Sequence, residues 1–228
     1  MKKYLVLLIV LVLSSVVFAQ ATFETDAAAW HKNAIMTCGM LKKMESFNQQ
    51  VMLQKLDALT SGMSEIQAKY ANNPPEAYKN DPMWKMYFML FQDNLKNIKE
   101  KVSNKQYKFA RVYCANICKT FGRMHRNNGT TDLTDLMFSL RMEIMGRMEM
   151  FSAHNYQGAS ANLSAVENLL NKVDLMAKGQ KNYAALFAPL KASILDWISA
   201  LKNGDHKKVK ESLGVFVGEF PKAYLDTL

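Results

Sequence analysis

The sequence predicts an all-α protein made of two tandem antiparallel four-helix bundles that follow an N-terminal signal peptide. Three observations predict this fold. Long segments are nearly free of Pro and Gly, apolar residues recur every three or four positions, and the chain resembles itself at a shift of 99 residues, from Leu95 to Ile194. Met, Leu, Ala and Lys, which favour helices, dominate these segments, and no segment has the alternation of a strand.

The N-terminus has the three parts of a secretory signal. Two lysines follow Met1, an apolar run covers residues 4–13, and Ala19-Gln20-Ala21 has the small-residue pattern of a cleavage site. The apolar run is shorter than the roughly 20 residues that a spanning helix needs. We expect residues 1–21 to be removed on export to the periplasm or the medium, with cleavage after Ala19 as the alternative. We expect no later transmembrane anchor.

The composition indicates a globular protein with a mildly basic surface. About 208 residues follow the signal, which is enough for one large domain or two small ones. The formal charge of +9 falls to +7 without Lys2 and Lys3, and the remaining basic residues alternate with acidic ones. A nucleic-acid surface would need clustered positive charge and a recognisable module, so we expect no nucleic-acid partner.

The apolar spacing predicts eight helices in two sets of four. The first set covers residues 24–47, 50–71, 82–103 and 105–127, and the second covers 132–153, 157–178, 182–202 and 205–225. Breakers separate several of them, at residues 72–75, 81–82, 127–129 and 203–205. We therefore expect one domain over 22–127 and a second domain of the same type over 130–228.

Two helices of the first half align without a gap on two helices of the second half. Leu95, Ile98 and Val102 fall on Ile194, Trp197 and Leu201. Beyond a shared turn, the stripe Cys114, Cys118, Phe121 and His125 falls on Leu213, Val217, Phe220 and Tyr224. Spacings of four, three and four place each stripe on one helix face, which we expect to point inward. Periodicity common to any two helices is the alternative to a true duplication.

Recurrent motifs surround the turn in each half. In the first half, Asp-Pro-Met-Trp at residues 81–84 precedes a helix with Phe91 and Leu95, and a short polar turn leads to Ala110 and Cys118. The second half repeats this from residues 203–205 to Tyr224, and it opens with the helix-like run from Leu140 to Met148. Together these motifs resemble the cytochrome c-prime family and its relatives among the soluble b-type four-helix-bundle cytochromes. In that family an Arg and an apolar residue of the first helix line the haem pocket.

The haem-attachment motif of that family is degenerate here. A c-type site reads Cys-x-x-Cys-His, with two thiols for the porphyrin and a His for the iron. The matching frame starts at Cys118 but has Phe121 in place of the second Cys and Gly122 in place of the His. The corresponding residues of the second half are Val217, Phe220 and Pro221. Gly and Pro cannot ligate iron, so we expect that covalent haem has been lost. Pro221 is also expected to kink or end the last helix.

A non-covalent haem site in the first half is an alternative hypothesis. A b-type cytochrome can hold haem between a His of the last helix and a Met of the first, which would be His125 with Met36 or Met40. His31 is a further candidate ligand. A His125 that is only a partly exposed residue near a helix end is the simpler interpretation.

The three cysteines suggest one disulfide in an exported protein. In an up-and-down bundle the first and fourth helices are neighbours, and counting turns from their ends brings Cys38 level with Cys114. A Cys38–Cys114 bridge is the leading pairing, Cys38–Cys118 is the alternative, and buried free thiols remain open. Cys114–Cys118 is disfavoured because residues four apart on a helix are poorly directed for bridging.

Methionine raises the hypothesis of a Cu(I) site. Met36, Met40 and Met44 form one stripe, with Cys38 and Cys114 nearby, and soft ligands select Cu(I). Met at helical spacing is more often core filling, and its abundance here also indicates a malleable core or a cavity for an apolar ligand.

No catalytic motif is present in the sequence, and the His residues at 31, 125, 154 and 206 are scattered. We predict an exported, non-enzymatic protein without a cofactor that binds a protein partner or a small apolar ligand, with a homodimer left open. The alternative is a b-type haem electron-transfer protein or a Cu(I)-binding protein that uses the first half.

Overall fold

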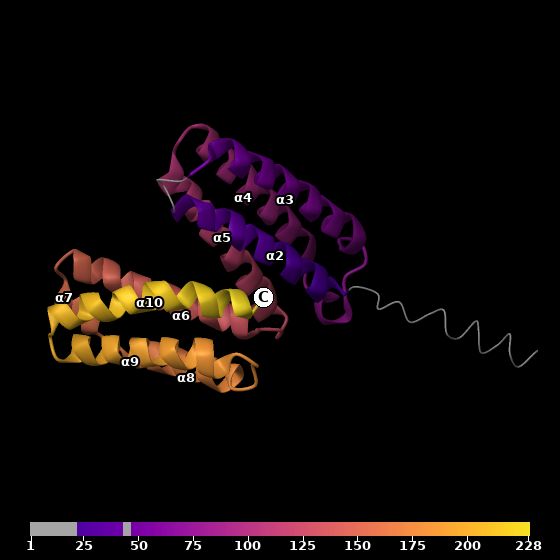
Figure 1. Ribbon diagram of the computed structural model, residues 1–228. Helices are drawn as coiled ribbons and strands as arrows, with labels where there is room; N and C mark the ends of the chain where they lie inside the picture. The colour runs from indigo at the N-terminus through magenta and orange to yellow at the C-terminus, as the bar shows by residue number, and fades with distance from the viewer. Residues whose placement is uncertain (1–21, 43–46) are drawn as a thin grey trace, which may run out of the picture.

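A computed structural model describes residues 22–42 and 47–228. The expected signal peptide at residues 1–21 and the candidate copper ligand Met44 lie outside the described residues. Helices account for the regular structure, and this part of the chain contains no strand. The all-α expectation is therefore confirmed. The helices form two groups, each around its own apolar core (Figure 1).

The first helical group consists of α2 to α5. It contains α2 (Phe23–Gly39), extended by the 3₁₀ turn η1 (Met40–Lys42), then α3 (Gln49–Tyr70), the 3₁₀ turn η3 (Glu76–Tyr78), α4 (Trp84–Ser103) and α5 (Tyr107–Asn127). Successive helices pack on one another, and α2 also packs on α5, which closes the group.

The second helical group consists of α6 to α10. Its elements are α6 (Leu133–Ser152), the short α7 (Tyr156–Ser160), α8 (Ser164–Ala177), the π-helical turn η4 (Tyr183–Phe187), α9 (Ala188–Lys202) and α10 (His206–Asp226). The chief contacts join α9 with α10 and α6 with α8, while α10 also touches α6.

Side-chain caps start several of these helices at polar residues. Thr22, Asn48 and Asp205 each accept a hydrogen bond from the backbone N–H three residues later. Asp132 and Asp135 form a reciprocal capping box at the start of α6. These bonds satisfy N–H groups that would otherwise have no partner in the first turn, so the polar residues between the apolar stripes fix where the helices begin.

Apolar spacing predicted most helix bounds within a few residues, but two predicted helices differ. The helix expected over 24–47 ends at Gly39 and η1. The helix expected over 157–178 is divided into α7 and α8, with Asn162 in the left-handed region at φ 48°. The buried Arg147 guanidinium donates to the carbonyls of Ala159, Ala161 and Asn162, which satisfies acceptors at this break. Pro221 lies inside α10 and does not end it.

The alignment of the two halves predicted the burial of the first stripe correctly, but it predicted the burial of the second stripe only in part. Leu95, Ile98 and Val102 are buried in the first core, and their counterparts Ile194, Trp197 and Leu201 are buried in the second. In the other stripe, Phe121 and Phe220 are buried as expected, whereas Val217 is 54% exposed. The expectation that Val217 points inward was wrong. Val217 lies seven residues, or about two turns, before the buried Tyr224 on α10, so helical spacing alone does not decide which of the two is covered.

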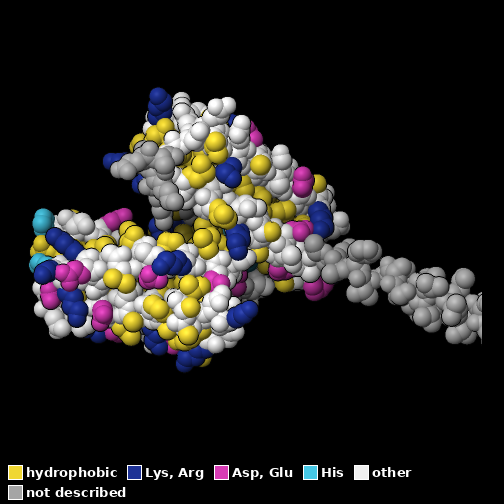
Figure 2. All heavy atoms as spheres, in the orientation of Figure 1, with side chains coloured by type: hydrophobic (Ala, Val, Ile, Leu, Met, Phe, Trp, Pro, Cys, Tyr) yellow, Lys and Arg dark blue, Asp and Glu magenta, His cyan; other side chains and the backbone are white. Residues whose placement is uncertain are grey.

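The groups meet where α5 leads into α6 and where α10 ends. Ile35, Ala115 and Cys118 of the first group pack against the second core. The Lys32 ammonium donates to the carbonyl of Leu225 at 3.4 Å. Away from these contacts a notch separates the groups, and Figure 2 shows hydrophobic side chains on its walls.

One segment of the described chain is long and apolar enough to cross a membrane. Tyr183–Lys202 has a mean hydropathy of 1.4 over its most apolar 18 residues, and because this criterion uses length and composition only, the expectation of no later transmembrane anchor stays a prediction. Its apolar residues Phe187, Leu190 and Ile194 belong to the second core. A core helix of a soluble protein has the same length and composition.

The difference between buried and exposed side chains of α4 can be tested by substitution. Leu95→Ala removes a side chain that is 1% exposed, and it should lower the free energy of unfolding by about 2–5 kcal/mol because the core cannot fully close the space. Met89→Ala on the same helix, at a position 52% exposed, should change it by less than about 0.5 kcal/mol. Denaturant unfolding followed by circular dichroism measures both, and equal effects would contradict this assignment of the core face.

Candidate functional site

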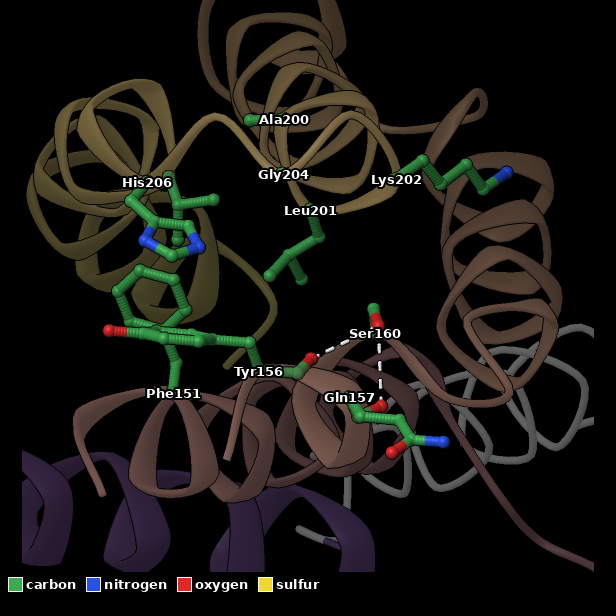
Figure 3. A pocket seen from close by; sticks show the side chains of 10 residues that line it. Phe151, Tyr156, Gln157, Ser160, Ala200, Leu201, Lys202, Gly204 and His206 are labelled. Atoms are coloured by element: carbon green, nitrogen blue, oxygen red, sulfur yellow. Dashed lines mark hydrogen bonds between the residues drawn. The ribbon is translucent and has the colours of Figure 1, made fainter. Parts of the chain in front are cut away.

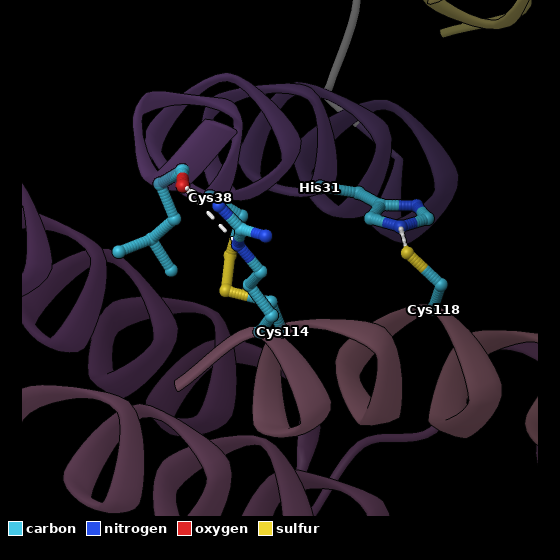
Figure 4. The surroundings of a disulfide bond; sticks show 6 residues. His31, Cys38, Cys114 and Cys118 are labelled. Carbon is cyan, nitrogen blue, oxygen red and sulfur yellow. Dashed lines mark hydrogen bonds between the residues drawn. A yellow bond between two sulfur atoms is a disulfide. The ribbon is translucent and has the colours of Figure 1, made fainter. Parts of the chain in front are cut away.

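The structure confirms the Cys38–Cys114 disulfide, which joins the end of α2 to α5 (Figure 4). The two Cα atoms are 5.9 Å apart. Arg111 donates through Nε to the carbonyl of Leu41 at 3.1 Å, which adds a second link between the two helices near the bridge. The bridge fixes the register of α2 against α5, and Cys118 is left as the free cysteine among the three.

The disulfide bears on the proposed copper ligands. Bonded sulfur atoms at Cys38 and Cys114 provide no thiolate for Cu(I) while the bridge is intact. Met36 is 57% exposed, and Met40 is half-buried against the first core. The structure therefore brings the two cysteines together as a covalent link and leaves Met36 on the surface.

Cys118 lies at the junction of the two helical groups. Its Sγ is 3.4 Å from Nε2 of His31, which is 4% exposed (Figure 4). On the other side it lies beside the hydroxyl of Tyr224 from α10. Tyr224 is 6% exposed, and its oxygen makes no standard hydrogen bond within the described chain. Side chains of α2, α5 and α10 thus converge at one buried point.

Burial keeps both members of the His31–Cys118 pair neutral. Desolvation lowers the pKa of His31 to about 3, against an opposing effect of Asp135. Desolvation raises the pKa of the Cys118 thiol from 9.0 to about 11, although Tyr224 and Arg141 act in the opposite direction. A reactive cysteine needs a depressed thiol pKa. This pair is therefore not arranged as a nucleophile and its base.

Phe121 and Gly122 serve packing rather than cofactor attachment. Phe121 is 2% exposed, stacks on His31 at a centroid distance of 4.2 Å and contacts Phe91 at 4.5 Å. A Cβ at Gly122 would lie 3.1 Å from Nη1 of Arg126 and 3.5 Å from Oδ1 of Asp135. A Cβ here would make ordinary contact with Asp135 of α6, so Gly122 lies in the contact between α5 and α6, a placement that sequence reasoning missed.

His125 pairs with α6 instead of pointing to an open coordination site. Its Nδ1 is 2.7 Å from Oδ2 of Asp135, and the same oxygen accepts from the backbone N–H of Asp132 at 3.3 Å. Burial opposes the charged imidazole, but the Asp135 hydrogen bond and charge, with help from Asp132 and Glu24, leave the pKa of His125 raised. Burial and the neighbouring Asp135 raise the pKa of Asp132.

His125, Asp132 and Asp135 also fit the spacing of a metal site. Their potential ligand atoms lie within 4.8 Å of one another. The ion pair and the capping box account for the arrangement, because they satisfy the imidazole and both carboxylates at the start of α6.

The residues proposed for b-type haem do not fit that group. Glu24, at the start of α2, contributes to the electrostatics of His125. Met36 is twelve residues further along α2, or about 18 Å at 1.5 Å per residue, and its side chain is 57% exposed. The Nε2 atom of His31 contacts the sulfur of Cys118, and the imidazole ring stacks on the ring of Phe121. The structure therefore does not bring the proposed axial pair together.

A cleft opens beside Cys118 between the two groups. It has a volume of about 400 Å³, within the range of small-molecule sites. Phe138, Met142 and Leu169 supply apolar surface, while Lys119 and Arg126 supply positive charge. Neither cation forms an ion pair with another residue in the described ranges. Asp135 and Glu143 also line the cleft, but Asp135 is paired with His125 and Glu143 with Arg147, each at 2.7 Å.

A second cavity, of about 340 Å³, lies at the far end of the second group (Figure 3). The ring of His206 lies over Tyr156 at 3.9 Å, and Phe151 contacts Tyr156 edge to face at 5.1 Å. The hydroxyl of Ser160 donates to backbone carbonyls of its own helix. These contacts explain how α7 is held against α9 and α10.

Comparison with known proteins gives no match for this chain, whether to a protein family, to a curated protein or to a solved structure. The site must therefore be interpreted from its own residues. Sequence reasoning placed Cys118 and His31 in the right region but missed Tyr224, Asp135 and the cleft. The alignment of Tyr224 with His125 was the available signal that Tyr224 faces inward.

The disulfide predicts the number of free thiols in the oxidised chain. Under denaturing, non-reducing conditions each chain should show one free thiol, and after reduction three. Removing the bridge with Cys38→Ser and Cys114→Ser should lower the free energy of unfolding by about 2–5 kcal/mol, because the closed loop spans 76 residues. Cys118→Ser is the matched control, and three free thiols in the unreduced protein would contradict the bridge.

The His125–Asp135 pair predicts a pH dependence. Because the folded pKa of His125 is raised, its contribution to stability is fully present below the unfolded value near 6.5 and is lost as pH rises through the folded value. The melting temperature of the wild type should therefore approach that of His125→Gln as the pH rises above 6.5. The exposed His154→Gln should follow the wild type throughout. A difference that grows with pH would refute this interpretation.

Proposed function

We propose that this chain is an exported, non-enzymatic protein that binds a small apolar ligand with an anionic group in the cleft beside Cys118. The observation that carries the proposal is the composition of that cleft. Phe138, Met142 and Leu169 provide an apolar wall, and Lys119 and Arg126 stand beside it without an ion pair, whereas the two carboxylates of the lining are paired with other residues. An apolar body would be desolvated against the wall, while an anionic group would remain near the two cations.

The remaining chemistry supports binding rather than catalysis. Burial raises the pKa of the Cys118 thiol to about 11 and lowers the pKa of His31 to about 3, so neither is prepared for nucleophilic or acid–base work near neutral pH. His125 is engaged by Asp135. The rigid walls come from α5, α6 and α8, which suits a preformed site.

Export is supported by the leader-like sequence together with the disulfide. Residues 1–21 have the pattern of a cleaved signal, and disulfides persist in oxidising compartments such as the periplasm. We place the mature protein in the periplasm or outside the cell. The mildly basic surface is consistent with an anionic ligand.

We also propose that the two helical groups are tandem four-helix bundles of the cytochrome c-prime type that have lost covalent haem. Separate cores and the matching burial of Leu95 with Ile194 and of Ile98 with Trp197 support duplication. Phe121 and Gly122 occupy the degenerate attachment positions, where they now serve packing. On this proposal, the contact between the two bundles created a new site after the cofactor was lost.

A fluorescent apolar anion, 1-anilinonaphthalene-8-sulfonate, tests the cleft. The folded protein should bind one equivalent, and Met142→Glu should weaken binding at least about tenfold by placing a charge on the apolar wall. Met150→Glu is the matched control, because Met150 is an exposed residue of the same helix outside the cleft lining. Equal loss of binding in the two variants, or no loss in either, would reject the cleft as the site.

A further inference from the structure

Three side chains with metal-binding atoms converge at the junction of the helical groups. His31 Nε2 and Cys118 Sγ are 3.4 Å apart. The hydroxyl of Tyr224 is buried beside the same thiol and makes no standard hydrogen bond within the described chain. Buried polar groups normally have partners, but this hydroxyl has none at standard hydrogen-bond distance, and the Cys118 thiol beside it acts as its nearest polar neighbour.

The observed separation of the sulfur and nitrogen atoms suits a shared metal ion. With a Zn–S bond of about 2.3 Å and a Zn–N bond of about 2.05 Å, a tetrahedral angle places the two ligand atoms about 3.6 Å apart. The observed 3.4 Å differs from this by less than the movement of a side chain within its rotamer well. The helices therefore already hold two ligand atoms at nearly the required distance.

We propose that His31, Cys118 and Tyr224 form a binding site for a divalent cation of borderline softness, such as Zn²⁺, which links the two helical groups. Imidazole and thiolate are preferred ligands of this ion, and the phenol oxygen supplies a third donor. His31 and Cys118 belong to the first group and Tyr224 to the second. A bound ion would connect α2, α5 and α10 at a single point.

Neighbouring contacts hold two of the three ligands in place. His31 stacks on Phe121 at 4.2 Å with an interplanar angle of 21°, which fixes the plane of the imidazole. Tyr224 stacks on Phe220 at 5.3 Å and 22°. Preorganised ligands of this kind reduce the ordering cost of metal binding.

The surrounding charge and the access route are compatible with a cation. Asp135 acts electrostatically on all three groups and is 5% exposed, so its negative charge is felt at the site. Arg141 acts on Cys118 in the direction that favours the thiolate. Cys118 also lines the cleft, which provides a route for the ion and room for water as a fourth ligand. The proposal does not depend on the apolar ligand, which would bind in the cleft itself.

Cobalt titration of the mature, disulfide-bonded chain tests the site, because a Co²⁺–thiolate bond has a charge-transfer absorption that weaker adventitious sites lack. The wild type should bind one equivalent of Co²⁺ with this absorption, and Zn²⁺ should remove it. With Cys38 and Cys114 oxidised, Cys118 is the thiol that can give the signal. Absence of the absorption in the wild type would overturn the proposal.

Three variants separate the ligands from the packing. Cys118→Ser should abolish the thiolate band. Tyr224→Phe and His31→Phe keep an aromatic ring in place while removing the donor atom, and each should weaken Co²⁺ binding at least about tenfold. Tyr224→Phe removes a buried unpartnered hydroxyl, so the metal-free variant should be at least as stable as the wild type.

A surface variant provides the control. His154→Gln alters an exposed His outside the site and should leave the titration unchanged. Unchanged affinity in Tyr224→Phe would show that the phenol is not a ligand and would overturn the three-residue site. A band that persists in Cys118→Ser would have the same consequence. Binding of the naphthalene probe should survive Tyr224→Phe, so failure of the metal site can be told from failure of the cleft.

Discussion

The antiparallel contact of α2 with α5 is the constraint on which the rest of this structure depends. The Cys38–Cys114 disulfide fixes the register of the two helices at one end. Further along the pair, Phe121 packs against Trp30 and His31 and fills the space between the helices. Because the register is fixed, Cys118 is directed towards the second helical group. Its neighbours there are Tyr224 and the cleft.

Asp135 then joins the second group to the first. It lies beside Gly122, where an added Cβ would be 3.5 Å from its Oδ1. Asp135 joins the capping box of α6 to the imidazole of His125, so one carboxylate both starts a helix and holds it on the preceding one. These residues of α5 and α6 thus define an interface. This is the physical basis for interpreting the junction as the functional site.

Much of the fold could be predicted from the sequence, because apolar residues at helical spacing reach the core wherever neighbouring helices can cover them. Leu95, Ile98 and their counterparts at 194 and 197 show this. The disulfide could be predicted by counting turns between α2 and α5. Val217 could not be placed, since helical spacing alone does not say which part of an apolar stripe another helix covers. Tyr224 meets Cys118 of a segment distant in sequence, and Asp135 meets His125 across the turn between two helices, and helical periodicity within one segment carries no signal for such contacts.

The central claim is that the two helical groups meet at the partly buried Cys118, beside which the binding site lies. The rate at which N-ethylmaleimide alkylates Cys118 in the native, disulfide-bonded protein tests it most directly. A thiol pKa raised from 9.0 to about 11 alone lowers the thiolate fraction near pH 8 about 100-fold, and burial should slow the reaction further. The account predicts alkylation at least about 100-fold slower than in the denatured chain, and slower still with the naphthalene probe bound. Alkylation as fast as in the denatured chain would contradict it.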